Sequence, residues 1–208
     1  MARIRNYVGQ LRFYSYVDLV LLLCALHAGL RVVCGASLLW FGFLIHLEWR
    51  HRDRGRLNWH WSIWASLWLA ALFVVPGYGT VAFYLCAVGY AYKKRFRWAA
   101  AVSPLLNGML KTFLALEAAA TTVGSAVLVM VLMSFRNLLG DIRDAAKDAE
   151  ENVMTVPVLA GYRRTTPYVY PCGLVATSLT WTLLGGLPWW AFAGAVAVQA
   201  GTYHLTPR

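Results

Sequence analysis

The amino-acid sequence predicts an all-α integral membrane protein, and three observations support this prediction. Hydrophobic residues make up 60% of the 208 residues and charged residues only 13%, which is too apolar for an ordinary soluble domain. The long apolar runs lack the alternation of a β-strand, and a helix satisfies its own backbone hydrogen bonds in lipid. Basic residues cluster at the ends of the apolar runs, as in the cytoplasmic loops of membrane proteins. Residues 1–208 are therefore expected to form a single transmembrane domain.

The helices can be placed along the chain in order. Residues 1–15 carry arginines among apolar side chains at roughly helical spacing, which predicts an interfacial amphipathic helix. The apolar run 16–47 is too long for one span, and Gly29, Arg31 and Gly35 favour a turn that divides it into two helices. Six further spans are expected as three helical hairpins: 58–76 with 79–92, 98–116 with 120–135, and 168–184 with 188–204.

The basic residues also predict the orientation of these eight spans. With a cytoplasmic N-terminus, all of the 19 lysines and arginines except Arg31 and Lys111 fall on the cytoplasmic side. This distribution predicts a multi-pass protein of the cell membrane whose two termini and acidic loop are cytoplasmic. Lys111 is expected to extend its side chain to the far interface. The net charge of +10 is accordingly assigned to contacts with membrane lipids, and no nucleic-acid partner is expected.

Two polar loops that contain acidic residues suggest an internal duplication. One loop follows the second span and the other follows the sixth. Two parallel four-helix halves, 16–97 and 98–208, would place both loops on the same side of the membrane, facing each other. Histidines near the first loop could hold a transition metal or haem, but their arginine- and tryptophan-rich surroundings favour interface positions. They are His46, His51 and His60.

The loop after the sixth span is strongly acidic. Five of the nine carboxylates of the chain lie between Asp141 and Glu151. On an α-helix, one amide and three of these carboxylates fall within about 60° of one another, while Arg143 and Lys147 point away. The four are Asn137, Asp141, Asp144 and Asp148. A hard divalent cation with further phosphate ligands would offset the repulsion between the carboxylates. The alternative is a solvated charged helix.

The acidic loop resembles the second aspartate-rich motif of the UbiA superfamily of intramembrane prenyltransferases. The family motif DxxDxxxD is matched by Asp141, Asp144 and Asp148, and its tail is similar to Thr155-Val-Pro157-Val158-Leu-Ala-Gly161. The segment Tyr90-Ala-Tyr92-Lys93-Lys94-Arg95 is similar to a Tyr/Lys/Arg segment that the family carries after the fourth span. The number of spans and the placement of the motifs agree along essentially the whole chain.

This resemblance implies a UbiA-like bundle of eight helices around a central cavity, and a Mg²⁺-dependent prenyltransferase. Such an enzyme holds a polyprenyl diphosphate through Mg²⁺ ions and alkylates a lipophilic acceptor after diphosphate departs. Asp141, Asp144 and Asp148 are then the catalytic residues and the metal ligands. The expected substrate-binding residues are Asn137, Lys93, Lys94, Arg95 and Arg50.

The first aspartate-rich motif of the family is degenerate here. Where the family has NDxxDxxxD, the chain reads Ile45-His46-Leu-Glu48-Trp-Arg50-His51-Arg52-Asp53-Arg54. Glu48 and Asp53 are therefore weaker candidates for metal ligands, and arginines could hold the phosphate directly. Two other functions stay open: a non-catalytic subunit or lipid-binding scaffold with membrane protein partners, and a terpene cyclase of the UbiA type.

Overall fold

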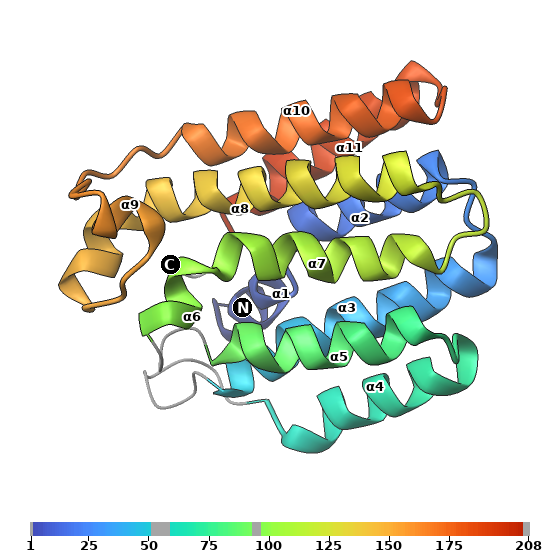
Figure 1. Ribbon diagram of the computed structural model, residues 1–208, viewed down its shortest axis with the longest axis horizontal. Helices are drawn as coiled ribbons and strands as arrows, with labels where there is room; N and C mark the ends of the chain where they lie inside the picture. The colour runs from blue at the N-terminus through green and yellow to red at the C-terminus, as the bar shows by residue number, and fades with distance from the viewer. Residues whose placement is uncertain (1, 51–58, 93–96, 206–208) are drawn as a thin grey trace. The chain divides into compact units, whose positions relative to one another are not determined.

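The computed structural model describes residues 2–50, 59–92 and 97–205, and within these ranges the chain is all-α, with no strands, as the sequence predicts (Figure 1). The described helices, in chain order, are α1 (Ala2–Gln10), α2 (Phe13–Ala25), α3 (Leu30–Arg50), α4 (Trp61–Val74), α5 (Tyr78–Ala91), α6 (Arg97–Ala101), α7 (Ser103–Leu116), α8 (Val123–Glu150), α9 (Val156–Leu159), α10 (Val169–Leu184) and α11 (Trp189–Tyr203).

Helices form over all eight of the predicted spans and over the predicted interfacial helix, and three of the predicted boundaries differ from the observed ones. The predicted interfacial helix 1–15 ends earlier, because Arg12 adopts a left-handed conformation (φ 48°) between α1 and α2. The predicted span 98–116 is broken into α6 and α7 before Ser103-Pro104, since proline favours the first turn of a new helix. The predicted span 120–135 continues to Glu150, so the acidic stretch is the second half of α8.

Two of the described helices, α3 and α8, are long and apolar enough to cross a membrane by length and composition. Four shorter helices are also apolar: α2, α4, α5 and α10. The coarser prediction of apolar helices is therefore confirmed.

The chain divides into two compact units. Unit 1 comprises Met1–Thr80, Glu117–Ala120 and Ser178–Arg208, and unit 2 comprises Val81–Leu116 and Thr121–Thr177. Each unit thus combines segments that lie far apart in the sequence. This division follows contacts and does not coincide with the two consecutive halves, 16–97 and 98–208, whose duplication stays a prediction.

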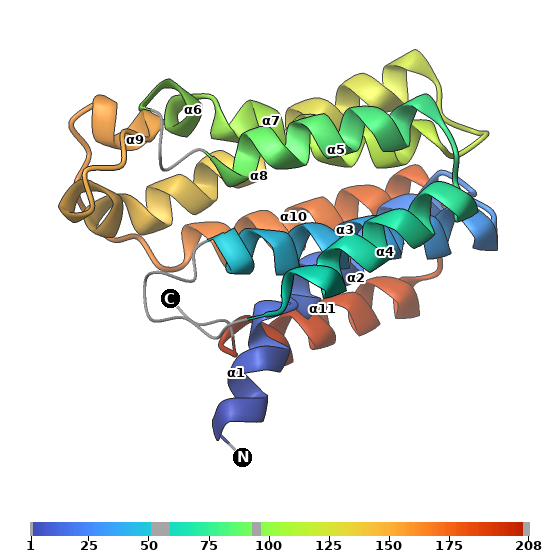
Figure 2. The same ribbon diagram turned by 90° about the horizontal axis from the view of Figure 1, so that it is seen from below.

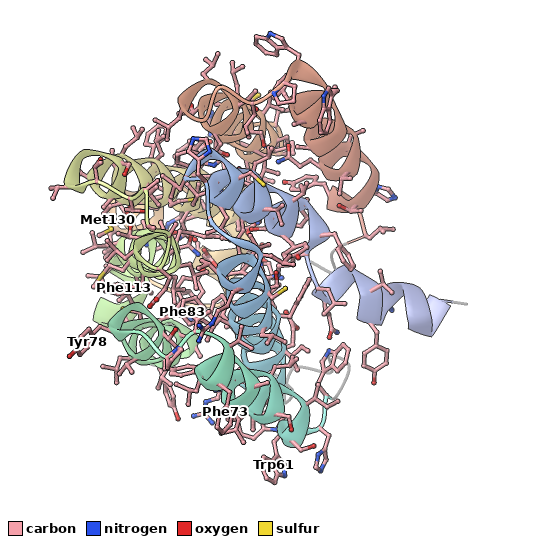
Figure 3. The ribbon with its side chains drawn as sticks, turned by 90° about the vertical axis from the view of Figure 1, so that its right-hand side faces the viewer. Trp61, Phe73, Tyr78, Phe83, Phe113 and Met130 are labelled. Atoms are coloured by element: carbon pink, nitrogen blue, oxygen red, sulfur yellow. The ribbon has the colours of Figure 1, made fainter. Side chains whose placement is uncertain are left out.

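In unit 1, α2 packs against α11 and α3 packs against α4 (Figure 2). The indole of Trp181, near the end of α10, is completely buried and donates a hydrogen bond from Nε1 to Asp18 Oδ1 at 3.2 Å. On α4, Trp61 and Phe73 are 55% and 78% exposed and point outward (Figure 3).

A carboxylate caps the start of α5. The backbone N–H of Thr80, in the first turn of α5, donates to Glu117 Oε1 at 3.0 Å, and the Thr80 hydroxyl donates to the Val75 carbonyl at 2.7 Å. The carboxylate thus satisfies one of the N–H groups that a helix leaves unpaired and lies at the positive end of the helix dipole.

Replacing Glu117 with alanine is therefore expected to lower the free energy of unfolding by about 1 kcal/mol. Glu117→Gln keeps an acceptor oxygen for the Thr80 N–H and should lose less than Glu117→Ala. The midpoint of denaturation in detergent, followed by tryptophan fluorescence, measures both variants. Equal midpoints for Glu117→Ala and the unmodified chain would contradict the capping role.

In unit 2, α7 packs along α8, and the short α9 contacts both α8 and α6. The Thr112 hydroxyl of α7 donates to Met130 Sδ of α8 at 3.8 Å, and Figure 3 shows Met130 and Phe113 on these two neighbouring helices. The contacts of α9 bring the tail that follows the acidic stretch back against α8.

Candidate functional site

The aspartate row, which we define as Asp141, Asp144 and Asp148, lies on the last turns of α8 in unit 2. Asp141 and Asp148 are buried, at 6% and 7% exposure, whereas the Asp144 side chain is 37% exposed. With a rise of 1.5 Å per residue, Asp141 and Asp148 lie about 10 Å apart along the helix axis. Asp144 is therefore the central carboxylate, one turn from each neighbour.

Asp141 is fixed by the start of α7. The hydroxyl of Ser103, the first residue of that helix, donates to Asp141 Oδ2 at 3.3 Å. Ser103 is completely buried. The break between α6 and α7 therefore places a hydrogen-bond donor at the first carboxylate of the row. The sequence pattern did not single out this serine.

Asp144 is held by its neighbour in the sequence. Arg143 Nε donates to Asp144 Oδ1 at 2.8 Å, and Arg143 Nη2 contacts Asp144 Oδ2, so the pair is bidentate. The prediction that Arg143 points away from the row is wrong, because its long side chain turns back toward the carboxylate. Lys147 instead lies 4.0 Å from Glu151, four residues further along the helix.

Asn137 extends the polar face by one turn toward the apolar half of α8. Tyr90 of α5 donates from its hydroxyl to Asn137 Oδ1 at 3.2 Å. The Asn137 Nδ2 atom is buried and has no hydrogen-bond partner among the described residues. An unsatisfied buried donor is costly and marks a position where a ligand or water can bind. The structure thus brings together two predicted residues, Asn137 and Tyr90.

The predicted tail of the motif forms α9. Thr155 precedes this helix, and Pro157 occupies its first turn. The Thr155 side chain is completely buried, and its Oγ1 has no hydrogen-bond partner among the described residues. Gly161 follows with a positive φ of 81°, a conformation that favours glycine. The tail therefore ends in a tight turn.

The remaining predicted residues belong to unit 1 or fall outside the described ranges. Glu48 and Arg50 are at the end of α3 in unit 1, where Glu48 is 3% exposed and accepts a contact of 3.2 Å from Arg12 Nη2. An arginine thus balances the charge of this candidate ligand. Four predicted residues lie outside the described ranges: Lys93, Lys94, Arg95 and Asp53.

Three buried charges were missed or misjudged from the sequence. Lys111 is completely buried, so the prediction that it extends to an interface is wrong. Arg136 is 3% exposed and donates to Thr177 Oγ1 at 3.4 Å. Asp18 is completely buried beside Trp181. Asp18 could have been identified from the sequence, because a charged residue within an apolar run is unusual.

The histidines take packing and capping roles in unit 1. The ring centroid of His46 lies 4.6 Å from that of Trp64 and 5.1 Å from that of Trp68. His60 precedes α4 and accepts a hydrogen bond from the Ser62 N–H at 3.3 Å. His51 lies outside the described ranges.

The carboxylates of the aspartate row fit Mg²⁺ if each ion takes only one or two of them and completes its shell with other oxygens. Over the described ranges, no group of three or more His, Cys, Asp or Glu side chains is placed to hold a metal ion. The reason is geometric, because a straight helix spreads the three carboxylates along its axis and they cannot converge on one ion. Mg²⁺ sites, however, commonly use one or two carboxylates and complete the shell with water and substrate phosphate oxygens. The row is suited to such a shared site.

The candidate site therefore consists of the aspartate row, its contacts with Ser103 and Arg143, and the hydrogen bond from Tyr90 to Asn137. No protein-family model, curated protein or solved structure matches the chain.

Proposed function

We propose that the protein is a Mg²⁺-dependent prenyltransferase of the membrane, which transfers the prenyl group of a polyprenyl diphosphate to a lipophilic acceptor. The observation that carries this proposal is the aspartate row. Three carboxylates, two of them buried, follow one another on the turns of a helix that is also long and apolar enough to cross a membrane. One helix thus offers oxygen ligands for a metal–diphosphate and an apolar surface for a prenyl chain.

The exposed surface of α8 supports a location in lipid. Four large apolar side chains recur at every fourth residue of its first half, each at least 56% exposed: Val123, Val127, Val131 and Phe135. A contiguous apolar stripe of this kind is unusual on a soluble monomer. The proposal adds the orientation that the basic residues favour, with several spans and with both termini and the aspartate row on the cytoplasmic side.

The proposed mechanism assigns a role to each polar group. Bound Mg²⁺ would neutralise the charge on the departing diphosphate. Asp141, Asp144 and Asp148 would hold the ions, and the Ser103 hydroxyl keeps the Asp141 carboxylate in place. Tyr90 orients the Asn137 amide, whose buried Nδ2 would donate to a phosphate oxygen. From the resemblance alone, Lys93, Lys94, Arg95 and Arg50 stay predictions for diphosphate binding, and Glu48 and Asp53 stay predictions for metal ligands.

The test is a product assay on the purified full chain in lipid nanodiscs. Radiolabelled geranylgeranyl diphosphate is supplied with Mg²⁺ or with EDTA, together with a lipid extract as the source of acceptors. Metal-dependent appearance of a prenylated lipid supports the proposal. A hydrocarbon or free alcohol as the only product would favour the terpene cyclase. An absence of turnover together with stably co-purifying membrane proteins would favour the non-catalytic subunit.

A further inference from the structure

Arg143 lies between the aspartate row and α10. Its Cζ is 4.7 Å from the ring centroid of Tyr170, in the first turn of α10, and its guanidinium makes the bidentate contact with Asp144. The Tyr170 ring in turn lies against Gly140, where a Cβ atom would be 3.3 Å from Tyr170 Cδ2. A cation over an aromatic face and a forked contact to a carboxylate are both orientations that guanidinium favours.

The contact between Arg143 and Asp144 offsets part of the negative charge of the aspartate row. Asp144 is the central carboxylate, and the guanidinium offsets its charge and occupies both of its oxygens. Asp141 and Asp148 are then left about 10 Å apart along the axis. Ligand oxygens lie about 2.1 Å from Mg²⁺, so these two short side chains cannot share one ion. The row can chelate a metal through adjacent carboxylates only when Asp144 takes part.

We infer that Arg143 and Tyr170 form a latch that sets the affinity of the aspartate row for divalent cations. The latch is closed when Arg143 contacts Asp144, and in this state Arg143 competes with the metal for that carboxylate. When the guanidinium moves away, the row of three carboxylates is complete. Arg143 is thus a positioning residue that acts through Asp144, and Tyr170 holds it in place. The inference rests on the proposed metal site of the aspartate row and adds its regulation.

Binding of Mn²⁺ to the full chain in neutral detergent tests the latch without any turnover. Free Mn²⁺ is measured by electron paramagnetic resonance as the ion is titrated. Arg143→Gln is expected to bind Mn²⁺ about 10-fold more tightly than the unmodified chain, because a charge-assisted contact that competes with the metal is removed. Lys147→Gln is the matched control. It removes the same charge from a half-exposed lysine that contacts Glu151, and it should change the affinity by no more than about 3-fold.

A double-mutant cycle shows whether Arg143 acts through Asp144. Arg143→Gln should have no further effect in a chain that already carries Asp144→Asn. Tyr170→Leu should tighten binding in the same direction as Arg143→Gln, while Tyr170→Phe keeps an aromatic face and should behave as the unmodified chain. Circular dichroism confirms that each variant is folded.

Two results would overturn the inference, and they are distinguishable. If the unmodified chain binds Mn²⁺ but Arg143→Gln matches Lys147→Gln, the latch is wrong and the proposed metal site stands. If neither the unmodified chain nor any variant binds Mn²⁺, the metal site of the proposed function fails and the latch fails with it.

Discussion

Asp144→Asn is expected to abolish the metal-dependent release of diphosphate that the proposed function requires, with a loss of about 100-fold or more in rate. Asp144 is the only carboxylate one turn from both Asp141 and Asp148, so its loss leaves two acids that cannot share an ion. The Asp144 side chain is 37% exposed, and asparagine has nearly the same shape, so the helices should remain folded. Release of diphosphate from a labelled prenyl diphosphate, with and without Mg²⁺, measures the effect.

Glu150→Gln provides the matched control for this substitution. Glu150 belongs to the same acidic stretch, is exposed, and lies at the last residue of α8. Glu150→Gln removes the same charge as Asp144→Asn, but outside the aspartate row. The rate of diphosphate release should stay within about 2-fold of that of the unmodified chain, because exposed charges are well screened. If Asp144→Asn released diphosphate as fast as Glu150→Gln, the aspartate row would have no place in the mechanism.

The helices could be predicted from the sequence because their signals are local. Apolar runs, glycine and proline punctuation, and clusters of arginine and lysine each act within a few residues. They correctly give helices over the predicted spans and place the aspartates on one face of a helix. The extension of α8 to Glu150 follows the same logic, since the acidic stretch contains alanine, lysine and glutamate, which favour helix.

The contacts of the site could not be predicted in the same way. The helical wheel places the Cβ of Arg143 away from the row, but the wheel says nothing of where a side chain with several rotatable bonds ends. The bond from Ser103 to Asp141 depends on where α6 breaks and on how α7 packs against α8. Asp18 and Lys111 are buried by tertiary packing, and one residue in an apolar run carries no periodic signal.

The ends of α2 and α10 come into direct contact in unit 1. Gly185 follows the last residue of α10, and its N–H donates to the Trp181 carbonyl at 3.1 Å. A Cβ atom at Gly185 would lie 2.4 Å from Ala25 Cα and 2.8 Å from Ala25 Cβ. Ala25 is the last residue of α2, so the obstacle is backbone and cannot rotate away as a flexible side chain would.

Gly185→Ala is therefore expected to lower the free energy of unfolding by about 2–3 kcal/mol, because the two helix ends must separate to admit one methyl group. Gly194→Ala on α11 is the control, since nothing lies within 4 Å of a Cβ at that position. Alanine favours helix over glycine, so this variant should be unchanged or more stable by about 0.5 kcal/mol. Thermal unfolding of both variants, followed by tryptophan fluorescence, measures the difference. Equal midpoints would show that the contact between the ends of α2 and α10 is not present in the folded protein.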